Sequence, residues 1–292
     1  MSLTFITEDD QAPGQVTEIA PGVRRLLCGN PGPFTGKGTN TWIIGEGEVA
    51  ILDPGPVDEA HLAAILKAVQ GERISHILVS HTHRDHSPGV AALRAATRAP
   101  SLGFGPHLTP PDQGGEGGDH DFLPDQPLHD GALIEGRGWR LRALHTPGHC
   151  ANHLCFALEG TGMLFSADHV MSWSTTVVSP PDGDMADYMG SLDKLLAVKE
   201  DRLYLPGHGA PLPEPRGFVE GLKAHRLARE ARVLEALAAH PGGTALDLVR
   251  PVYGPGLAEK LVPAAARSLL AHLIKLESEG HAISERGHWR AV

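Results

Sequence analysis

The sequence predicts a mixed α/β protein with a small helical unit at its C-terminal end. Short apolar stretches recur along the first two thirds of the chain, and several are followed by a loop and a helical pattern. Repeated units of strand, loop and helix are typical of α/β folds. The chain then passes through a proline-rich segment, residues 211–215, into long helical patterns. We therefore expect two domains, at residues 1–213 and 214–292.

Length and composition limit the classes of protein to consider. With 292 residues and 41% hydrophobic residues, the chain can build a substantial core, and no apolar stretch is long enough to cross a membrane. The first ten residues lack the basic residues and apolar core of a signal peptide. Three cysteines are too few for a disulfide framework, and we expect Cys150 to be a buried free thiol. These features predict a cytoplasmic protein with no membrane partner.

The expected elements of the first domain follow from apolar spacing and turn residues. Residues 1–20 are mostly polar and predict a frayed lead into the first strand. The expected strands and helices are, in chain order, strands 23–27, 41–44 and 49–52, helix 60–69, strand 73–80, helix 88–94, strands 141–144 and 163–165, helix 187–198 and strand 203–205.

The second domain is expected to contain three helices and a hairpin. A long helix is predicted over 218–240, and Thr244 with Asp247 resembles a capping box that starts a second helix. A third helix over 263–279 ends at Gly280, and residues 281–292 form a hairpin around Arg286 and Gly287. Helices followed by a terminal hairpin resemble a winged-helix unit.

The segment Ser80-His-Thr-His-Arg-Asp-His-Ser-Pro-Gly89 carries the chemistry. It lies between a predicted strand and a predicted helix. His81 and His83 are two apart and can face one centre, while Asp85 and His86 can face a second centre after the chain turns. Imidazole and carboxylate groups are ligands for zinc and similar divalent metals. The alternative is a chance cluster of surface histidines, because 18 residues are histidine, but this spacing favours metal binding.

The ordered pattern resembles the His-x-His-x-Asp-His signature of the metallo-β-lactamase superfamily. The other parts of the family pattern follow apolar stretches in the expected order: Asp53, His149, Asp168 and His208. The resemblance covers roughly residues 22–209. It implies a four-layer αββα sandwich, to which a small winged-helix-like C-terminal domain is attached.

The resemblance also implies a binuclear metal site. His81, His83 and His149 would bind one ion, Asp85, His86 and His208 the second, and Asp168 would bridge both. We expect two Zn²⁺ ions, with Mn²⁺ or Fe as alternatives, sharing a hydroxide that attacks the substrate. Asp85 would move the proton of this hydroxide, and Asp53 would orient a ligand or bound water.

Further motifs narrow the branch of the family. Asp168 stands where di-zinc β-lactamases have Cys or Ser, which argues against antibiotic hydrolysis. The stretches Asn30–Pro33, Gly38–Thr41, Thr175–Val177 and Asp187–Leu192 resemble the β-lactamase-like protein 2 branch, which includes a single-strand-specific endoribonuclease.

The resemblance thus implies a metal-dependent hydrolase of an ester, thioester or phosphodiester, with a small molecule or single-stranded RNA as substrate. Alternatives are a hydroxyacylglutathione hydrolase or lactonase, and a persulfide dioxygenase-like oxidoreductase with one iron. Tyr188, His153 and His169 are candidate substrate-binding residues. For Tyr188 the favoured reading is packing of its helix, and for each histidine support of the metal ligands is equally open.

The charge of the chain divides unevenly between its parts. Residues 1–213 hold 14 basic and 26 acidic residues, a net charge of −12, and residues 214–292 have a net charge of +2. Lys223, Arg226, Arg229 and Arg232 form a basic row on the long helix, read more readily as a solvated face than as a phosphate site. We expect residues 214–292 to border the active-site mouth without supplying metal ligands. The oligomeric state stays open, with a homodimer among the options.

Overall fold

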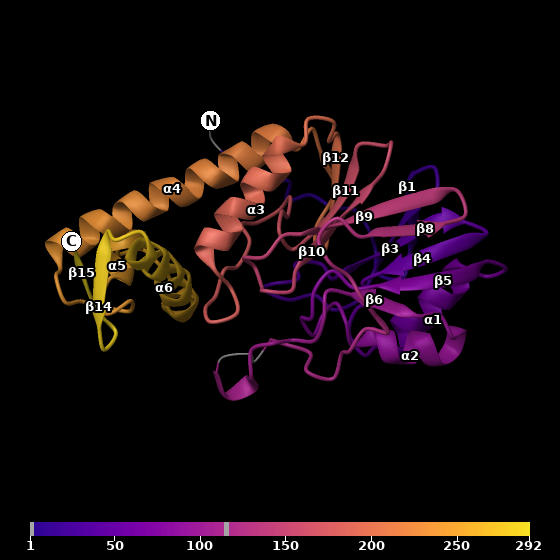
Figure 1. Cartoon of the computed structure of the whole chain (residues 1–292), viewed down its shortest axis with the longest axis horizontal. Coiled ribbons are helices and arrows are strands. Elements are labelled where there is room, and N and C mark those ends of the chain that lie inside the picture. The colour runs from indigo at the N-terminus through magenta and orange to yellow at the C-terminus, as the bar shows by residue number, and fades with distance from the viewer. Residues whose placement is uncertain (1–2, 114–116) are drawn as a thin grey trace.

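The computed structural model describes residues 3–113 and 117–292. Within this part of the chain two mixed β-sheets pack face to face, with helices on the outer face of each, so the four-layer αββα arrangement is confirmed (Figure 1). The first sheet contains β1 (Val16–Ala20), β2 (Val23–Leu27), β3 (Asn40–Glu46), β4 (Glu48–Leu52), β5 (Arg73–Leu78), β6 (Ser101–Gly103) and β7 (Gln126–Pro127), in that order.

The second sheet has the order β13-β12-β11-β10-β9-β8. Its strands are β8 (Leu133–Gly136), β9 (Trp139–His145), β10 (Leu154–Leu158), β11 (Met163–Ala167), β12 (Leu203–Pro206) and β13 (Leu212–Pro213). The predicted hairpin is present, because β3 and β4 pair antiparallel with Trp42 opposite Leu52. β4 pairs with β5, and β11 with β12, in parallel. Loops that follow β4, β5, β11 and β12 therefore emerge at carboxyl edges of their sheets.

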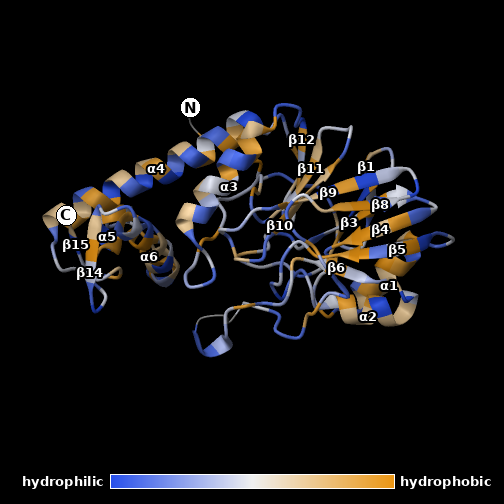
Figure 2. Cartoon of the chain, in the orientation of Figure 1, coloured by the Kyte–Doolittle hydropathy of each residue, from blue (hydrophilic) through white to orange (hydrophobic). Residues whose placement is uncertain are grey.

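Three apolar cores hold the sandwich together. Between the sheets, large side chains such as Trp42, Phe156 and Phe165 are fully buried, and the Trp42 and Phe165 rings meet edge to face at 5.7 Å. The hydropathy colouring shows the strands of both sheets to be mainly apolar (Figure 2). Helices α1 (Glu59–Ala68) and α2 (Gly89–Thr97) cover the outer face of the first sheet. Helix α3 (Met185–Ala197) covers the second.

The C-terminal part forms a winged-helix unit with its own core. It contains α4 (Arg216–Ala239), α5 (Val249–Tyr253), α6 (Val262–Ser278), β14 (Ala282–Glu285) and β15 (His288–Ala291). A short 3₁₀ turn at Glu259–Leu261 precedes α6, and another lies in the sandwich at Pro111–Gln113. The predicted reciprocal bonds between Thr244 and Asp247 are present, but the second helix begins only at Val249. The chain between them forms turns.

Helix α4 belongs to two cores at once. Near its start, Val219 and Leu222 pack with α3 against the second sheet. Near its end, Val233 and Leu237 pack in the core of the winged-helix unit. Figure 1 shows this long helix running from the sandwich to the C-terminal unit. The domain boundary expected at residue 213 thus falls at the start of an element that both parts share, and it stays a prediction.

The N-terminal segment is ordered more firmly than its polar composition predicts. The Asp9 carboxylate pairs with the guanidinium of Arg25, with Nη2 and Oδ2 2.6 Å apart, and both side chains are largely buried. The amide of Ile6 donates to the carbonyl of Ser172, and the ring of Phe5 meets that of Phe218. The expectation of a frayed lead is wrong for the described residues 3–20, because long-range contacts fix them.

Candidate metal centre

Loops at one edge of the sandwich bring seven potential metal ligands together. The loop after β5 carries His81, His83, Asp85 and His86, and the loop after β9 carries His149. Asp168 follows β11, and His208 follows β12. Two sets of three side chains, which share no residue, are close enough to hold one ion each, and a further set joins His81 and His86 to Asp168.

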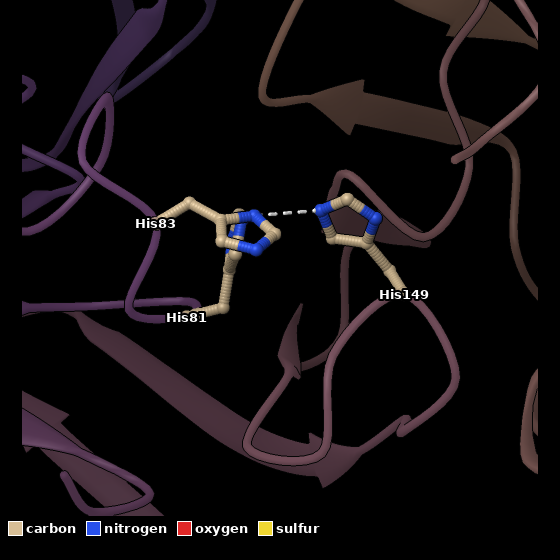
Figure 3. Close-up of side chains that lie close together, drawn as sticks. All are labelled: His81, His83 and His149. Atoms are coloured by element: carbon tan, nitrogen blue, oxygen red, sulfur yellow. Dashed lines mark hydrogen bonds between the residues drawn. The ribbon is translucent and has the colours of Figure 1, made fainter. Parts of the chain in front are cut away.

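The first set consists of three imidazoles. Nε2 of His81 lies 3.0 Å from Nδ1 of His83, and that Nδ1 lies 2.9 Å from Nε2 of His149. Figure 3 shows one ring nitrogen of His83 directed at one of His149, with His81 beside His83. His83 thus presents its Nδ1 atom, whereas its two neighbours present Nε2.

The second set combines a carboxylate with two imidazoles. Nε2 of His208 lies 3.1 Å from Oδ2 of Asp85 and 3.3 Å from Nε2 of His86. His86 and His208 are almost completely buried, whereas the side chain of Asp85 is 27% exposed. Asp85 is therefore the ligand of this set that a molecule in solution can reach.

Asp168 lies between the two sets. Its Oδ2 atom is 3.6 Å from Nε2 of His149 in the first set and 3.4 Å from Nε2 of His208 in the second. Its Oδ1 atom is buried without a hydrogen-bond partner and lies 3.6 Å from Nε2 of His86. A buried carboxylate oxygen with no partner is costly, and a cation offsets that cost.

The far nitrogens of four ligand histidines are held by the protein. Nδ1 of His149 bonds to the carbonyl of Val177 at 2.6 Å, and Nδ1 of His208 to the carbonyl of Gly38 at 3.1 Å. Nδ1 of His81 contacts the hydroxyl of Ser80. His86 has a carboxylate behind it, described next. Such partners fix the tautomer and orientation of a metal-binding histidine.

Asp53 is a positioning residue behind the second set. Its Oδ2 atom lies 3.0 Å from Nδ1 of His86 and accepts a hydrogen bond of 2.6 Å from the hydroxyl of Ser80. Asp53 is only 1% exposed, so it orients ligands and does not touch the cavity. Its φ angle of 54° is unusual for a residue other than glycine, and such strain persists where surrounding contacts enforce it.

A glycine directly precedes each of His149 and His208, as part of a Pro-Gly pair, and the structure shows why glycine is needed there. A Cβ atom at Gly207 would lie 2.4 Å from Oδ1 of Asp168 and 2.8 Å from Cε1 of His86. Gly148 has a φ of 130°, and a Cβ there would lie 2.3 Å from Cα of Tyr188. Both motifs therefore need glycine so that backbone and ligands can approach closely.

Electrostatics differ between the two sets. Burial, together with the nearby imidazole of His149, lowers the pKa of His83 to about 3. Burial would also lower the pKa of His208, but the carboxylates of Asp168 and Asp85 raise it to about 9. Burial raises the pKa of Asp168, yet the facing imidazoles of His208 and His86 hold it well below its ordinary value. The carboxylates therefore stay ionised.

These groups fit two divalent metals. Ligands bonded to one zinc at about 2.0–2.1 Å in a tetrahedron lie roughly 3.3–3.4 Å apart, close to the separations within each set. Imidazole nitrogens that face each other at 3.0 Å can share at most one proton, so a proton alone does not satisfy three of them. Nitrogen and oxygen donors suit zinc, iron or manganese.

A cavity of about 420 Å³ opens onto the ligands. His83, Asp85, His149 and Asp168 form part of its wall, and so do Arg84 and Val177 from the quoted motifs. The wall also includes residues that the sequence did not single out: Phe34, Thr35, His107, Gly117, Gly118, Met171, Ser179, Asp182 and Arg267. Arg267 comes from α6, which confirms that the C-terminal part borders the site. The others lie in loops and carried no signal in the sequence.

The three predicted substrate-binding residues are all fully buried. Nε2 of His153 accepts a hydrogen bond from the amide of Asp168, which supports a metal ligand. The hydroxyl of Tyr188 donates to the carbonyl of His169, and their rings lie 4.8 Å apart. None of the three lines the described cavity, so their contact with substrate stays a prediction. The packing reading for Tyr188 is confirmed.

The basic row on α4 is also different from the exposed row expected. Arg226 is only 4% exposed and donates to the carbonyl of Thr176. Arg229 is half-buried, with its guanidinium 4.0 Å from the centre of the Tyr253 ring, and Lys223 pairs with Asp193. The solvated-face reading is wrong for Arg226, because α4 packs against the segment that carries Thr176.

Cys150 is a buried free thiol, as predicted. It lies with Asp182 within reach of His83, so these three could form another metal-binding group. Burial raises the pKa of the Cys150 thiol well above its ordinary value. In the absence of a metal ion the thiol is therefore protonated.

Comparison with known proteins agrees with this site. Residues 34–208 match the metallo-beta-lactamase superfamily, and residues 244–289 match the beta-lactamase associated winged helix domain. The chain is 34% identical over 283 residues to the beta-lactamase-like protein 2 homolog of Drosophila melanogaster, covering 91% of each chain. It is 33% identical over 277 residues to an atrochrysone carboxyl ACP thioesterase of Paecilomyces divaricatus, covering 91% of this chain and 83% of the relative.

The solved structures include a close match in fold. A beta-lactamase domain protein from Burkholderia ambifaria superimposes with a TM-score of 0.82 at 25% identity, and the match covers 97% of this chain and 96% of that one. The similarity therefore extends over both the sandwich and the C-terminal unit.

Proposed function

This chain belongs to the metallo-β-lactamase superfamily of hydrolases, and we propose that it hydrolyses a thioester with two divalent metal ions. The observation that carries the proposal is the pair of three-ligand sets joined by Asp168 at the wall of a 420 Å³ cavity. The similarity to a thioesterase over 91% of the chain favours a thioester among the bonds that such a site can cleave.

The ligand sets assign the metals to residues. His81, His83 and His149 would hold one ion, Asp85, His86 and His208 the other, and Asp168 both. Zinc is the metal that we propose first, given these nitrogen and oxygen donors. Bound there, divalent ions supply Lewis acidity for the substrate carbonyl and lower the pKa of a water molecule from ~15.7 toward ~7.

Asp85 is the proposed proton carrier. It is the partly exposed carboxylate of the second set and lines the cavity. In the reaction, the oxygen of water bonds to the acyl carbon, the C–S bond breaks, and the products are a carboxylate, a thiol and one proton that passes to solvent. Asp85 accepts a proton from the attacking water and returns it to the departing sulfur. Asp53 contributes through the orientation of His86 and, by way of Ser80, of His81.

The test is a hydrolysis assay on protein whose metal content has been measured. We expect about two ions per chain and release of free thiol from an S-acyl pantetheine. A carboxylic ester, a lactone, a phosphodiester and single-stranded RNA serve as competing substrates. Absence of thiol release by the metal-loaded protein would overturn the proposal. Cleavage of RNA alone would mean that the site hydrolyses a phosphodiester and not a thioester.

Metal analysis also separates the oxidoreductase alternative. A persulfide dioxygenase-like enzyme would contain one iron per chain and consume oxygen with a persulfide substrate. Two ions per chain and no oxygen consumption are the results expected here.

In residues 3–113 and 117–292, no helix is long and apolar enough to cross a membrane.

A further inference from the structure

A second cavity, of about 570 Å³, lies between the sandwich and the C-terminal unit. We call it the interdomain cavity. Its walls come from residues 175–179 of the sandwich and from α4, α5 and residues 257–268. Four residues line both cavities: Phe34, Val177, Ser179 and Arg267. The two cavities are therefore neighbours, and one extended molecule can occupy both.

Arg226 is the most deeply buried cation of this wall. Its side chain is 4% exposed, one Nη atom donates to the carbonyl of Thr176, and the guanidinium lies 5.3 Å from the centre of the Tyr188 ring. Its Nε atom is buried without a hydrogen-bond partner. Among the residues that the structure describes, Arg226 forms no ion pair with a carboxylate.

Arg229 adds a second cation one turn along the same helix. Nη1 donates to the carbonyl of Val252 at 3.4 Å, and the guanidinium stacks on Tyr253. Burial and the neighbouring Arg232 and Arg226 lower its pKa, although Tyr253 opposes them. Lys260 also lines the cavity, and no Asp or Glu occurs among the described lining residues.

Buried guanidinium groups without counterions are unfavourable, because desolvation is not offset by an opposite charge. Arginine binds phosphate and carboxylate groups through paired N–H donors. Apolar side chains, including Leu257, Leu261 and Pro263, form much of the remaining wall. The cavity thus combines positive charge with apolar surface, which matches an organic arm that ends in an oxyanion.

We propose that the interdomain cavity binds a phosphate or carboxylate at the far end of the substrate, with Arg226 and Arg229 as its counterions. The proposal rests on the proposed function, because the scissile thioester has to lie in the neighbouring metal cavity. It narrows the substrate to thioesters with an anionic arm. Phosphate and carboxylate share the required chemistry, and the substrates below distinguish them.

The experiment compares two pairs of thioesters with the same acyl group. The first pair is an S-acyl 4′-phosphopantetheine and the S-acyl pantetheine that lacks the phosphate. The second pair is an S-acyl glutathione and its diethyl ester, which lacks both carboxylate charges. We expect kcat/KM to be roughly 10–100-fold higher for the charged member of one pair, as for a charge-assisted hydrogen bond. The pair that shows this preference identifies the oxyanion.

Variants then test which residues cause the preference for the anionic substrate. Arg229→Gln should reduce it to about 2-fold or less. Lys260→Gln changes an exposed residue of the same wall and should reduce the preference for the anionic substrate in part. It replaces Arg229→Gln as the test if that variant folds poorly. Arg232→Gln is the matched control, because Arg232 is exposed on the same helix and does not line the cavity. It should retain the wild-type preference.

Binding of the free thiols, measured by calorimetry, separates the subsite from the proposed reaction. If no thioester is hydrolysed, but 4′-phosphopantetheine or glutathione binds more tightly than the partner that lacks the oxyanion and Arg229→Gln abolishes the difference, the subsite is supported and the proposed function fails. Equal affinity and equal kcat/KM within both pairs would overturn the subsite. A preference that survives in Arg229→Gln and Lys260→Gln would overturn it too.

Discussion

The two ligand sets differ in what stands behind them. His81, His83 and His149 are three imidazoles, and the outer nitrogens of His81 and His149 meet neutral partners, a serine hydroxyl and a backbone carbonyl. In the second set, Asp85 is itself a ligand and the Asp53 carboxylate backs His86. The first set lines the cavity through His83 and His149, whereas His86 and His208 are nearly inaccessible.

This difference assigns separate tasks to the two sets. More carboxylate charge around the second set favours retention of a cation there. The first set is more open and has less negative charge, so an ion held there is better able to polarise an incoming carbonyl group. Asp168 joins the two tasks because its oxygens face both sets.

The largest effect should come from Asp168→Ala, which removes a ligand from both sets. We expect a metal content well below two ions per chain and an activity more than about 100-fold lower than that of the wild type. This loss exceeds the effect of removing a residue that only supports a metal ligand, which is roughly 10–100-fold. Elemental analysis and thiol release measure the two quantities. Full metal content with full activity would show that Asp168 bridges nothing.

His208→Ala tests whether the sets act separately. It should reduce metal content from about two ions to about one, since the first set keeps all its imidazoles. His83→Ala is the matched variant for the first set and should also leave about one ion. If either variant lost both ions, the sets would have to be regarded as one cooperative site.

Asp53→Asn should weaken metal binding by roughly 10–100-fold, the range for partners of metal ligands. The weaker ion should be the one in the second set, because Asp53 contacts His86 directly and reaches His81 only through Ser80. Chelator competition, which resolves two affinities, is the measurement. A larger loss of metal affinity at the first set than at the second would contradict the role of Asp53 behind the second set.

The smallest effect is expected from Thr176→Val, which keeps side-chain shape but removes a hydroxyl. That hydroxyl donates to the backbone carbonyls of Asp168 and His169, at 2.8 and 2.9 Å. Its loss removes the donor to the Asp168 carbonyl, whereas the His169 carbonyl keeps the hydroxyl of Tyr188, and should lower the free energy of unfolding by about 1–3 kcal/mol. Urea denaturation measures the change, which should leave metal content at about two ions. Loss of an ion would mean that this segment holds the ligands in place.

The spacing of His81, His83, Asp85 and His86 predicted a metal-binding cluster, and the resemblance to the family added His149, Asp168 and His208 to the expected ligand set. His81 to His86 fall within six positions, and His149 and His208 each follow a Pro-Gly pair. Local spacing sufficed for the strands as well, since alternation and turn residues mark them. The β3–β4 hairpin and the terminal hairpin are examples.

Features that depend on distant contacts were not predictable in this way. The spacing of Arg226 and Arg229 indicates one face of a helix, but burial depends on where residues 175–177 pack, which no local pattern records. His107 and Asp182 line the metal cavity from loops without a motif. Asp9 helps to order the N-terminal segment through Arg25, sixteen positions away.

The shared helix α4 has a consequence for how the molecule unfolds. Its 24 residues extend about 36 Å, and its two ends are embedded in two different cores. Melting the winged-helix core would leave the far half of the helix unsupported, and a fraying helix loses its remaining turns readily. The two parts are thus thermodynamically coupled and should melt as a single cooperative unit, so that damage to either core lowers the stability of both.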